Sequence, residues 1–244
     1  LNAANCYEQL KLWSKAKLVH QQYINSYGNE NPDECIECYW KLGELSLNSK
    51  DENSALNEFI KTVEKYNEFK RKGISVGEYI PAKAQFSIAE INYNRYKQVK
   101  LVPPLDQALK KKTGLLQTVL KEYVSAGKYQ VADWTTASLF KTGLTFEDLA
   151  ESFQNSFVPP ELDTEEKEAY LAGINKQAVS AKQKALEVYK ANVANAERSN
   201  IQNEWVDQSK QRMETLIIEL GLGTQINSAQ QSSTGTIVPT SQIK

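Results

Sequence analysis

Apolar residues recur every three to four positions along most of the chain, which is the period of an amphipathic α-helix. The first apolar stripe lies within residues 5–27 and consists of Leu10, Trp13, Ala16, Val19, Tyr23 and Ile24. The same pattern predicts further helices over residues 33–48, 54–72, 81–99, 105–126, 129–157, 164–198 and 201–220. The sequence therefore predicts an all-α protein whose helices follow one another along the chain.

Glycine and proline interrupt this pattern at a few places only, since the 244 residues include 11 glycines and 7 prolines. That is too few turn residues for an all-β sandwich, in which turns recur about every 8–12 residues. Proline cannot donate a backbone hydrogen bond inside a helix, so Pro103-Pro104 and Pro159-Pro160 are expected in loops. Asp33 is a predicted N-cap, and Asp163 with Glu166 forms a predicted capping box.

The helical pattern ends at about Leu220, and residues 221–244 are rich in Ser, Thr, Gln and Gly. This composition supplies too little apolar area for the segment to fold alone. Its only apolar stretch covers residues 236–243, where Pro239 favours an extended conformation of the residue before it. We expect an extended tail that docks, on this chain or on a neighbouring subunit, through Ile237, Val238 and Ile243. The alternative is a mobile tail.

Residues 36–69 carry the pattern of a 34-residue helical repeat. Tyr39 stands at position 4 of this pattern, and Leu42-Gly43 occupies positions 7 and 8. Ala55 stands at position 20 and Phe59 at position 24. Small residues at positions 8 and 20 allow neighbouring helices to approach closely, and the aromatic side chain at position 24 fills the space between them. With these residues the segment resembles a tetratricopeptide repeat.

The pattern returns in degenerate form over residues 82–127 and 129–198, and a closing helix over residues 201–220 follows. The recurring positions are held by Ile88-Ala89, Leu139 with Gly143, Ala185 with Tyr189, and Trp205 with Ser209. The chain thus resembles tetratricopeptide repeat proteins over about residues 5–220. The resemblance implies a repeat domain of residues 1–220 and a separate tail of residues 221–244. It also implies a right-handed superhelical solenoid of about four antiparallel helix pairs with lengthened helices.

Two short segments, residues 158–162 and 203–205, look like the C-terminal repeats of large repeat proteins of Gram-negative bacterial envelopes. This narrower resemblance favours the periplasm or cell envelope, with the cytoplasm as the alternative. The chain begins with Leu1 and has no initiator methionine, which indicates a processed or partial chain. A signal peptide or lipid anchor could then have been lost upstream.

In tetratricopeptide repeat proteins the first helix of each pair lines a concave groove. The resemblance implies that the groove of this chain is lined by Glu37, Trp40, Glu44, Lys83, Phe86, Glu90, Tyr93 and Asn94. Large aromatic side chains beside polar ones are typical of a surface that binds a peptide or a partner subunit. The competing interpretation is that Trp40 and Phe86 pack against neighbouring helices because the repeats are irregular.

The charge balance argues against a nucleic-acid partner, and the hydropathy argues against a membrane-spanning segment. The chain has 29 Lys and Arg against 30 Asp and Glu, so no general basic field is available to hold nucleic acid. The local cluster Lys110-Lys111-Lys112 is either a solvated helix face or a patch for an acidic partner. No run of about 18 apolar residues occurs, so no membrane-spanning segment is expected.

Residues suited to catalysis or metal binding are scarce. The single histidine, His20, lies within a predicted helix without an acidic residue nearby in the sequence to orient it, so we expect a packing or surface role. Cys35 and Cys38 are three positions apart in one helix and are either structural thiols or a redox pair at a helix N-terminus. The usual four ligands of a structural zinc site cannot be assembled. We expect no metal site, no cofactor and no catalytic residue.

These patterns predict a non-enzymatic scaffold that binds protein partners or peptides through a repeat groove, within a larger multi-subunit assembly. The alternative is an accessory helical domain of a longer enzyme that acts on cell-wall polymer, with the catalytic part outside this chain.

Overall fold

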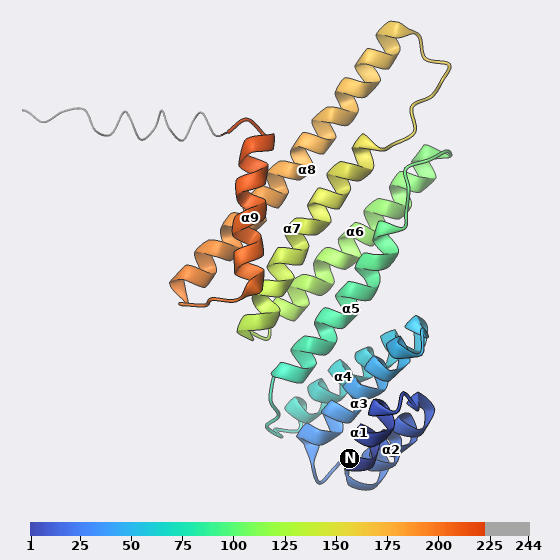
Figure 1. Cartoon of the computed structure of the whole chain (residues 1–244), viewed down its shortest axis with the longest axis vertical. Coiled ribbons are helices and arrows are strands. Elements are labelled where there is room, and N and C mark those ends of the chain that lie inside the picture. The colour runs from blue at the N-terminus through green and yellow to red at the C-terminus, as the bar shows by residue number, and fades with distance from the viewer. Residues whose placement is uncertain (223–244) are drawn as a thin grey trace, which may run out of the picture.

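The computed structural model describes residues 1–222, and every regular element within them is an α-helix. The helices of this part are α1 (Asn2–Gln9), α2 (Trp13–Tyr27), α3 (Pro32–Asn48), α4 (Glu52–Arg71), α5 (Tyr79–Lys97), α6 (Leu105–Gly127), α7 (Ala132–Gln154), α8 (Thr164–Arg198) and α9 (Glu204–Glu219). Figure 1 shows an elongated stack with α1 and α2 at one end and α8 and α9 toward the other. The predicted all-α class is confirmed.

Helices that are consecutive in the sequence pack against each other throughout the stack, from α1 on α2 to α8 on α9. From α3 onward the odd-numbered helices also touch in succession: α3 contacts α5, α5 contacts α7, and α7 contacts α9 (Figure 1). We call these four helices the odd-helix row. The predicted groove residues all lie on its first two members, α3 and α5.

The core is divided among several local clusters along the stack. One cluster joins α3, α4 and α5 around Trp40, Phe59 and Ile88. The next joins α5, α6 and α7, and a third joins α7, α8 and α9 around Phe140 and Tyr189. Each cluster buries the apolar side of one helix pair against the following helix, which is the packing expected when a single pair cannot cover its own apolar face.

Two glycines mark the closest approaches between paired helices, as the repeat pattern predicts. A Cβ atom added to Gly43 in α3 would lie 2.5 Å from the ring of Phe59 in α4. A Cβ atom added to Gly143 in α7 would lie 2.5 Å from the ring of Tyr189 in α8. The expectation that Gly43 and Gly143 lie at close helix–helix approaches is therefore confirmed.

The prediction of one helix over residues 5–27 is wrong, because two helices occupy this region. The chain turns at Lys11, whose φ of 55° lies in the left-handed region, and α1 folds back onto α2. Ala4 in α1 and Ala16 in α2 are both fully buried, and side chains of this size permit close packing of the two helices. In the sequence, the apolar period continues through this turn because it includes Leu10, although Leu10 is exposed in the structure. Periodicity alone therefore does not reveal the break.

The predicted capping box of α8 is confirmed, since the Asp163 carboxylate accepts from the Glu166 amide and the Glu166 carboxylate accepts from the Asp163 amide. The predicted N-cap Asp33 is wrong. Pro32 already stands at the first position of α3, with Asn31 as the N-cap. The Asp33 carboxylate accepts instead from the Gly77 amide at 2.9 Å and thereby ties α3 to the loop that precedes α5.

The predicted docking residues of the tail, Ile237, Val238 and Ile243, lie outside the described residues.

Candidate functional site

The structure places the three aromatic side chains of the predicted groove inside the stack. Trp40, Phe86 and Tyr93 are 6%, 8% and 4% exposed, respectively. Trp40 packs in the cluster of α3, α4 and α5, whereas Phe86 and Tyr93 pack in the cluster of α5, α6 and α7. Of the polar residues predicted with them, Glu37 and Asn94 are exposed and Glu44, Lys83 and Glu90 are partly buried.

Lys83 of α5 lies between two indole rings that come from its neighbours in the odd-helix row. Its Nζ is 3.7 Å from the centre of the Trp40 ring of α3 and 5.9 Å from that of the Trp134 ring of α7. Such contacts stabilise a cation through the quadrupole of the aromatic ring. Burial lowers the pKa of the Lys83 ammonium, with the nearby Glu44 carboxylate opposing the shift.

The ammonium of Lys83 and the indole N–H groups of Trp40 and Trp134 are three donors without an acceptor among the described residues. Within residues 1–222, Lys83 Nζ makes no side-chain hydrogen bond or ion pair. The indole Nε1 groups of Trp40 and Trp134 are buried and also have no hydrogen-bond partner in this part of the chain. Buried donors without partners are uncommon in folded proteins, because each one loses its bond to water. We call Lys83, Trp40 and Trp134 the Lys83 cluster.

The carboxylates nearest to the Lys83 cluster are engaged elsewhere or point to solvent. Glu44 accepts from Lys41 at 2.9 Å, and Lys41 also donates to Glu8 of α1 at 3.2 Å. Glu37 is exposed. The ammonium of Lys83 is therefore available to an acceptor from outside the described chain.

The other polar groups of the predicted groove hold helices together. The Glu90 carboxylate of α5 accepts from Lys141 of α7 at 2.7 Å and from the Tyr123 hydroxyl of α6. Tyr93 of α5 donates its hydroxyl hydrogen to Asp148 of α7. Burial raises the pKa of the Asp148 carboxyl, although the Tyr93 hydrogen bond opposes the shift. These contacts serve the α5–α6–α7 packing.

A hydrogen-bonded chain of a thiol, an imidazole and a carboxylate lies near the N-terminal end. His20 Nδ1 is 3.4 Å from Cys38 Sγ, and His20 Nε2 is 3.1 Å from Glu8 Oε1. The sequence offers no acidic residue adjacent to His20, and the turn at Lys11 is what brings Glu8 to it. His20 has a packing role, as expected, because it is 4% exposed.

Cys38, His20 and Glu8 follow one another as the thiol, imidazole and carboxylate of a cysteine–histidine catalytic site do, but the thiol is buried. Cys38 is 1% exposed, and burial raises its pKa to about 12. Nucleophilic catalysis needs an accessible thiolate, so the geometry supports a structural hydrogen bond here. Cys35 is also buried, and burial raises its pKa too. Within the described residues no group of three or more His, Cys, Asp or Glu side chains is placed to hold a metal ion.

Lys112 departs from both interpretations of the lysine cluster. It is 1% exposed, and its Nζ donates to the backbone carbonyls of Tyr96 and Val99 at 3.3 and 2.9 Å. It therefore caps the C-terminal end of α5, where cations are favoured by the helix dipole. Its neighbours Lys110 and Lys111 are exposed. No sequence signal reveals the buried position, because a run of three lysines normally indicates a solvent-exposed helix face.

No protein-family profile, curated protein or solved structure matches this chain. No helix within residues 1–222 has the length and apolar character needed to cross a membrane.

Proposed function

We propose that the chain is a non-enzymatic scaffold of tetratricopeptide-like repeats, a right-handed solenoid that binds a segment of a partner protein along its odd-helix row. Support comes from the recurring helix pairs, the close approach of Gly43 to Phe59 and of Gly143 to Tyr189, and the successive contacts of the odd-numbered helices. A scaffold of this kind within a larger assembly, such as one of the bacterial cell envelope, presents partner-binding groups on the helices of that row.

The observation that carries the proposal is the surplus of donors in the Lys83 cluster. An ammonium and two indole N–H groups have no acceptor among residues 1–222, whereas the lysine is partly exposed. A carboxylate of a partner segment supplies an acceptor and a counter-charge for the Lys83 ammonium, which is the accessible donor of the three. A charge-assisted hydrogen bond in a partly dry site is stronger than a neutral one. The partner is therefore a protein segment that presents Asp, Glu or a C-terminal carboxylate.

The test compares acidic peptides with peptides in which each Glu is replaced by Gln, on an array probed with the folded chain. We expect acidic peptides to bind the wild-type chain and to lose about tenfold in affinity with Lys83→Gln, which removes the charge and keeps a polar side chain only one atom shorter. Lys190→Gln is the matched control, because Lys190 is an exposed lysine of α8 without an ion pair among the described residues.

Equal binding of the Lys83→Gln and wild-type chains would exclude the Lys83 cluster as the anchor. Equal binding of the Glu and Gln peptides would show that a carboxylate is not what the site recognises. Circular dichroism of both variants establishes that the fold is retained.

A further inference from the structure

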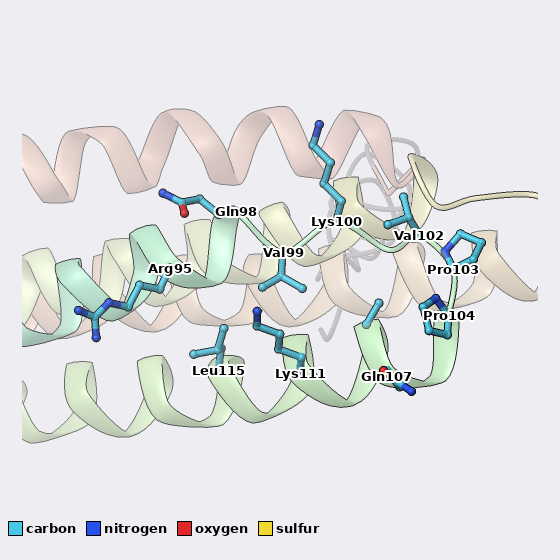
Figure 2. A pocket seen from close by; sticks show the side chains of 11 residues that line it. Arg95, Gln98, Val99, Lys100, Val102, Pro103, Pro104, Gln107, Lys111 and Leu115 are labelled. Atoms are coloured by element: carbon cyan, nitrogen blue, oxygen red, sulfur yellow. The ribbon is translucent and has the colours of Figure 1, made fainter.

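A hollow of about 770 Å³ lies beside the loop that joins α5 to α6, at the opposite end of α5 from Lys83. Three cationic side chains line it, Arg95 from the end of α5, Lys100 from the loop, and Lys111 from α6. Figure 2 shows the strand-like path of the loop above α6, with Val99, Lys111 and Leu115 between them. No carboxylate lines the hollow.

Two of the three cations are uncompensated. Neither Lys100 nor Lys111 forms an ion pair with another residue of the described part. Arg95 is held in place, because its Nε donates to Glu52 at 2.7 Å and its Nη2 donates to Asn53 at 3.0 Å. The hollow is therefore a local region of positive charge on a chain whose net charge is −1.

The rest of the lining is mostly apolar, with Gln98 and Gln107 as its two amide side chains. Val99, Val102 and Leu115 contribute aliphatic side chains, and two consecutive prolines end the loop. The buried Lys112 fixes the start of the loop by donating to the carbonyl of Val99 at 2.9 Å. The hollow thus combines a preformed apolar surface with cations at its edge, which is the usual composition of a small-molecule site.

We propose that this hollow binds an organic polyanion, a small molecule whose carbon skeleton lies on the aliphatic lining and whose phosphate or carboxylate groups contact Lys100, Lys111 and Arg95. Lysine acts as a point charge toward such groups, and the Nη1 of Arg95 is free to donate among the described residues. Binding weakens as salt concentration rises, because the charges lie at the surface of the molecule.

This inference is independent of the Lys83 cluster. The two places share no residue and lie at opposite ends of α5, so substitutions in one leave the other intact. A chain that fails to bind acidic peptides can therefore still bind a polyanion, and the reverse also holds.

The experiment titrates the full chain with citrate and, separately, with inorganic phosphate and pyrophosphate, at low ionic strength, by isothermal calorimetry and by amide NMR shifts. We expect saturable binding with shifts at residues 95–115, and at least a tenfold rise in Kd for the double variant Lys100→Gln, Lys111→Gln. Lys110→Gln is the matched control, because Lys110 is the neighbouring exposed lysine and does not line the hollow. Its Kd should stay within twofold of wild type.

Binding of citrate without binding of the phosphates assigns polycarboxylates, and the converse assigns phosphorylated molecules. The proposal is overturned if no probe saturates, if the Lys110→Gln and double variants weaken binding equally, or if the double variant binds like wild type. All substituted side chains are exposed, and a thermal melt of each variant shows whether the fold is unchanged.

Discussion

At the scale of single residues, the contact between Gly43 and Phe59 has a direct energetic consequence. The Phe59 ring is 1% exposed, so it has little room to retreat from a Cβ atom that would lie 2.5 Å away. Gly43→Ala should therefore lower the free energy of unfolding by about 1–3 kcal/mol through overpacking, as measured by urea denaturation.

The control for this substitution is Gly114→Ala. Gly114 lies inside α6 with nothing within 4 Å of the added Cβ. This change should raise the free energy of unfolding by up to about 1 kcal/mol, because alanine has the higher helix propensity. Opposite signs are expected for the two glycines, and a stabilising effect at Gly43 would contradict the close approach.

Asp148 gives a prediction that depends on pH. Burial raises the pKa of its carboxyl in the folded state, so ionisation of this group costs folding free energy. The favourable contribution of the protonated form is present below the unfolded pKa and is lost as the pH rises through the folded pKa. Asp148→Asn keeps an acceptor for the Tyr93 hydroxyl and removes the charge.

We therefore expect Asp148→Asn to be at least as stable as wild type at pH 7, and its advantage to shrink toward pH 3. Chemical denaturation at several pH values measures both quantities. A variant that is less stable than wild type at pH 7, with a deficit that shrinks toward pH 3, would contradict this expectation and show that the Tyr93 contact requires the ionised carboxylate.

Single residues also show where sequence reasoning stops. Gly43 and Gly143 could be predicted as contact points, because small residues at fixed repeat positions have a steric reason. The burial of Lys112 could not be predicted, because it depends on the C-terminal end of α5 lying against α6. Trp40 and Phe86 show the same limit. The sequence pattern predicts that they lie on α3 and α5, whereas their burial depends on which helices pack against them.

At the scale of elements, the first turns of α8 depend on their cap. The Asp163 side chain accepts from the Glu166 amide at 2.8 Å, and α8 begins in a segment whose side chains are mostly exposed. With little packing to hold these turns, the cap has a large share in their stability. Asp163→Ala should destabilise the start of α8 by about 1 kcal/mol.

Hydrogen exchange measures this effect as faster exchange of the amides at residues 165–172. Glu161→Ala is the matched control, because it removes an exposed carboxylate two residues earlier that takes no part in the cap. Equal acceleration by the two substitutions would mean that charge near the helix start matters and the cap bonds do not.

Most helices could be predicted from apolar period and proline positions, within a few residues at each end. The break between α1 and α2 could not be predicted, because the segment contains neither glycine nor proline and Lys11 adopts a left-handed conformation that lysine seldom takes. The contact of Glu8 with His20 depends on that break, so it could not be predicted from the sequence either.

At the scale of the whole molecule, three of the core clusters each join one helix pair to the helix after it. The stability of such an array is close to a sum of local terms and nearest-neighbour terms. A defect in α3 should therefore remain local. In Gly43→Ala we expect amides of α3 and α4 to lose exchange protection, whereas amides of α8 and α9 keep wild-type protection.

Segment-resolved hydrogen exchange in mild denaturant measures this difference, and Gly143→Ala serves as the reciprocal control because its contact with Tyr189 lies at the other end. Uniform loss of protection along the chain in both variants would show that the stack unfolds as a single cooperative unit.

The succession of neighbour contacts has a mechanical consequence as well. A tension applied between α1 and α9 passes through every helix interface in series, because the contacts run from each helix to those beside it along the stack. The weakest interface then yields first while the others stay closed, and the chain lengthens by one helix pair at a time. If stability is local in this way, we expect the stack to lengthen pair by pair under tension and to refold pair by pair when the tension is removed.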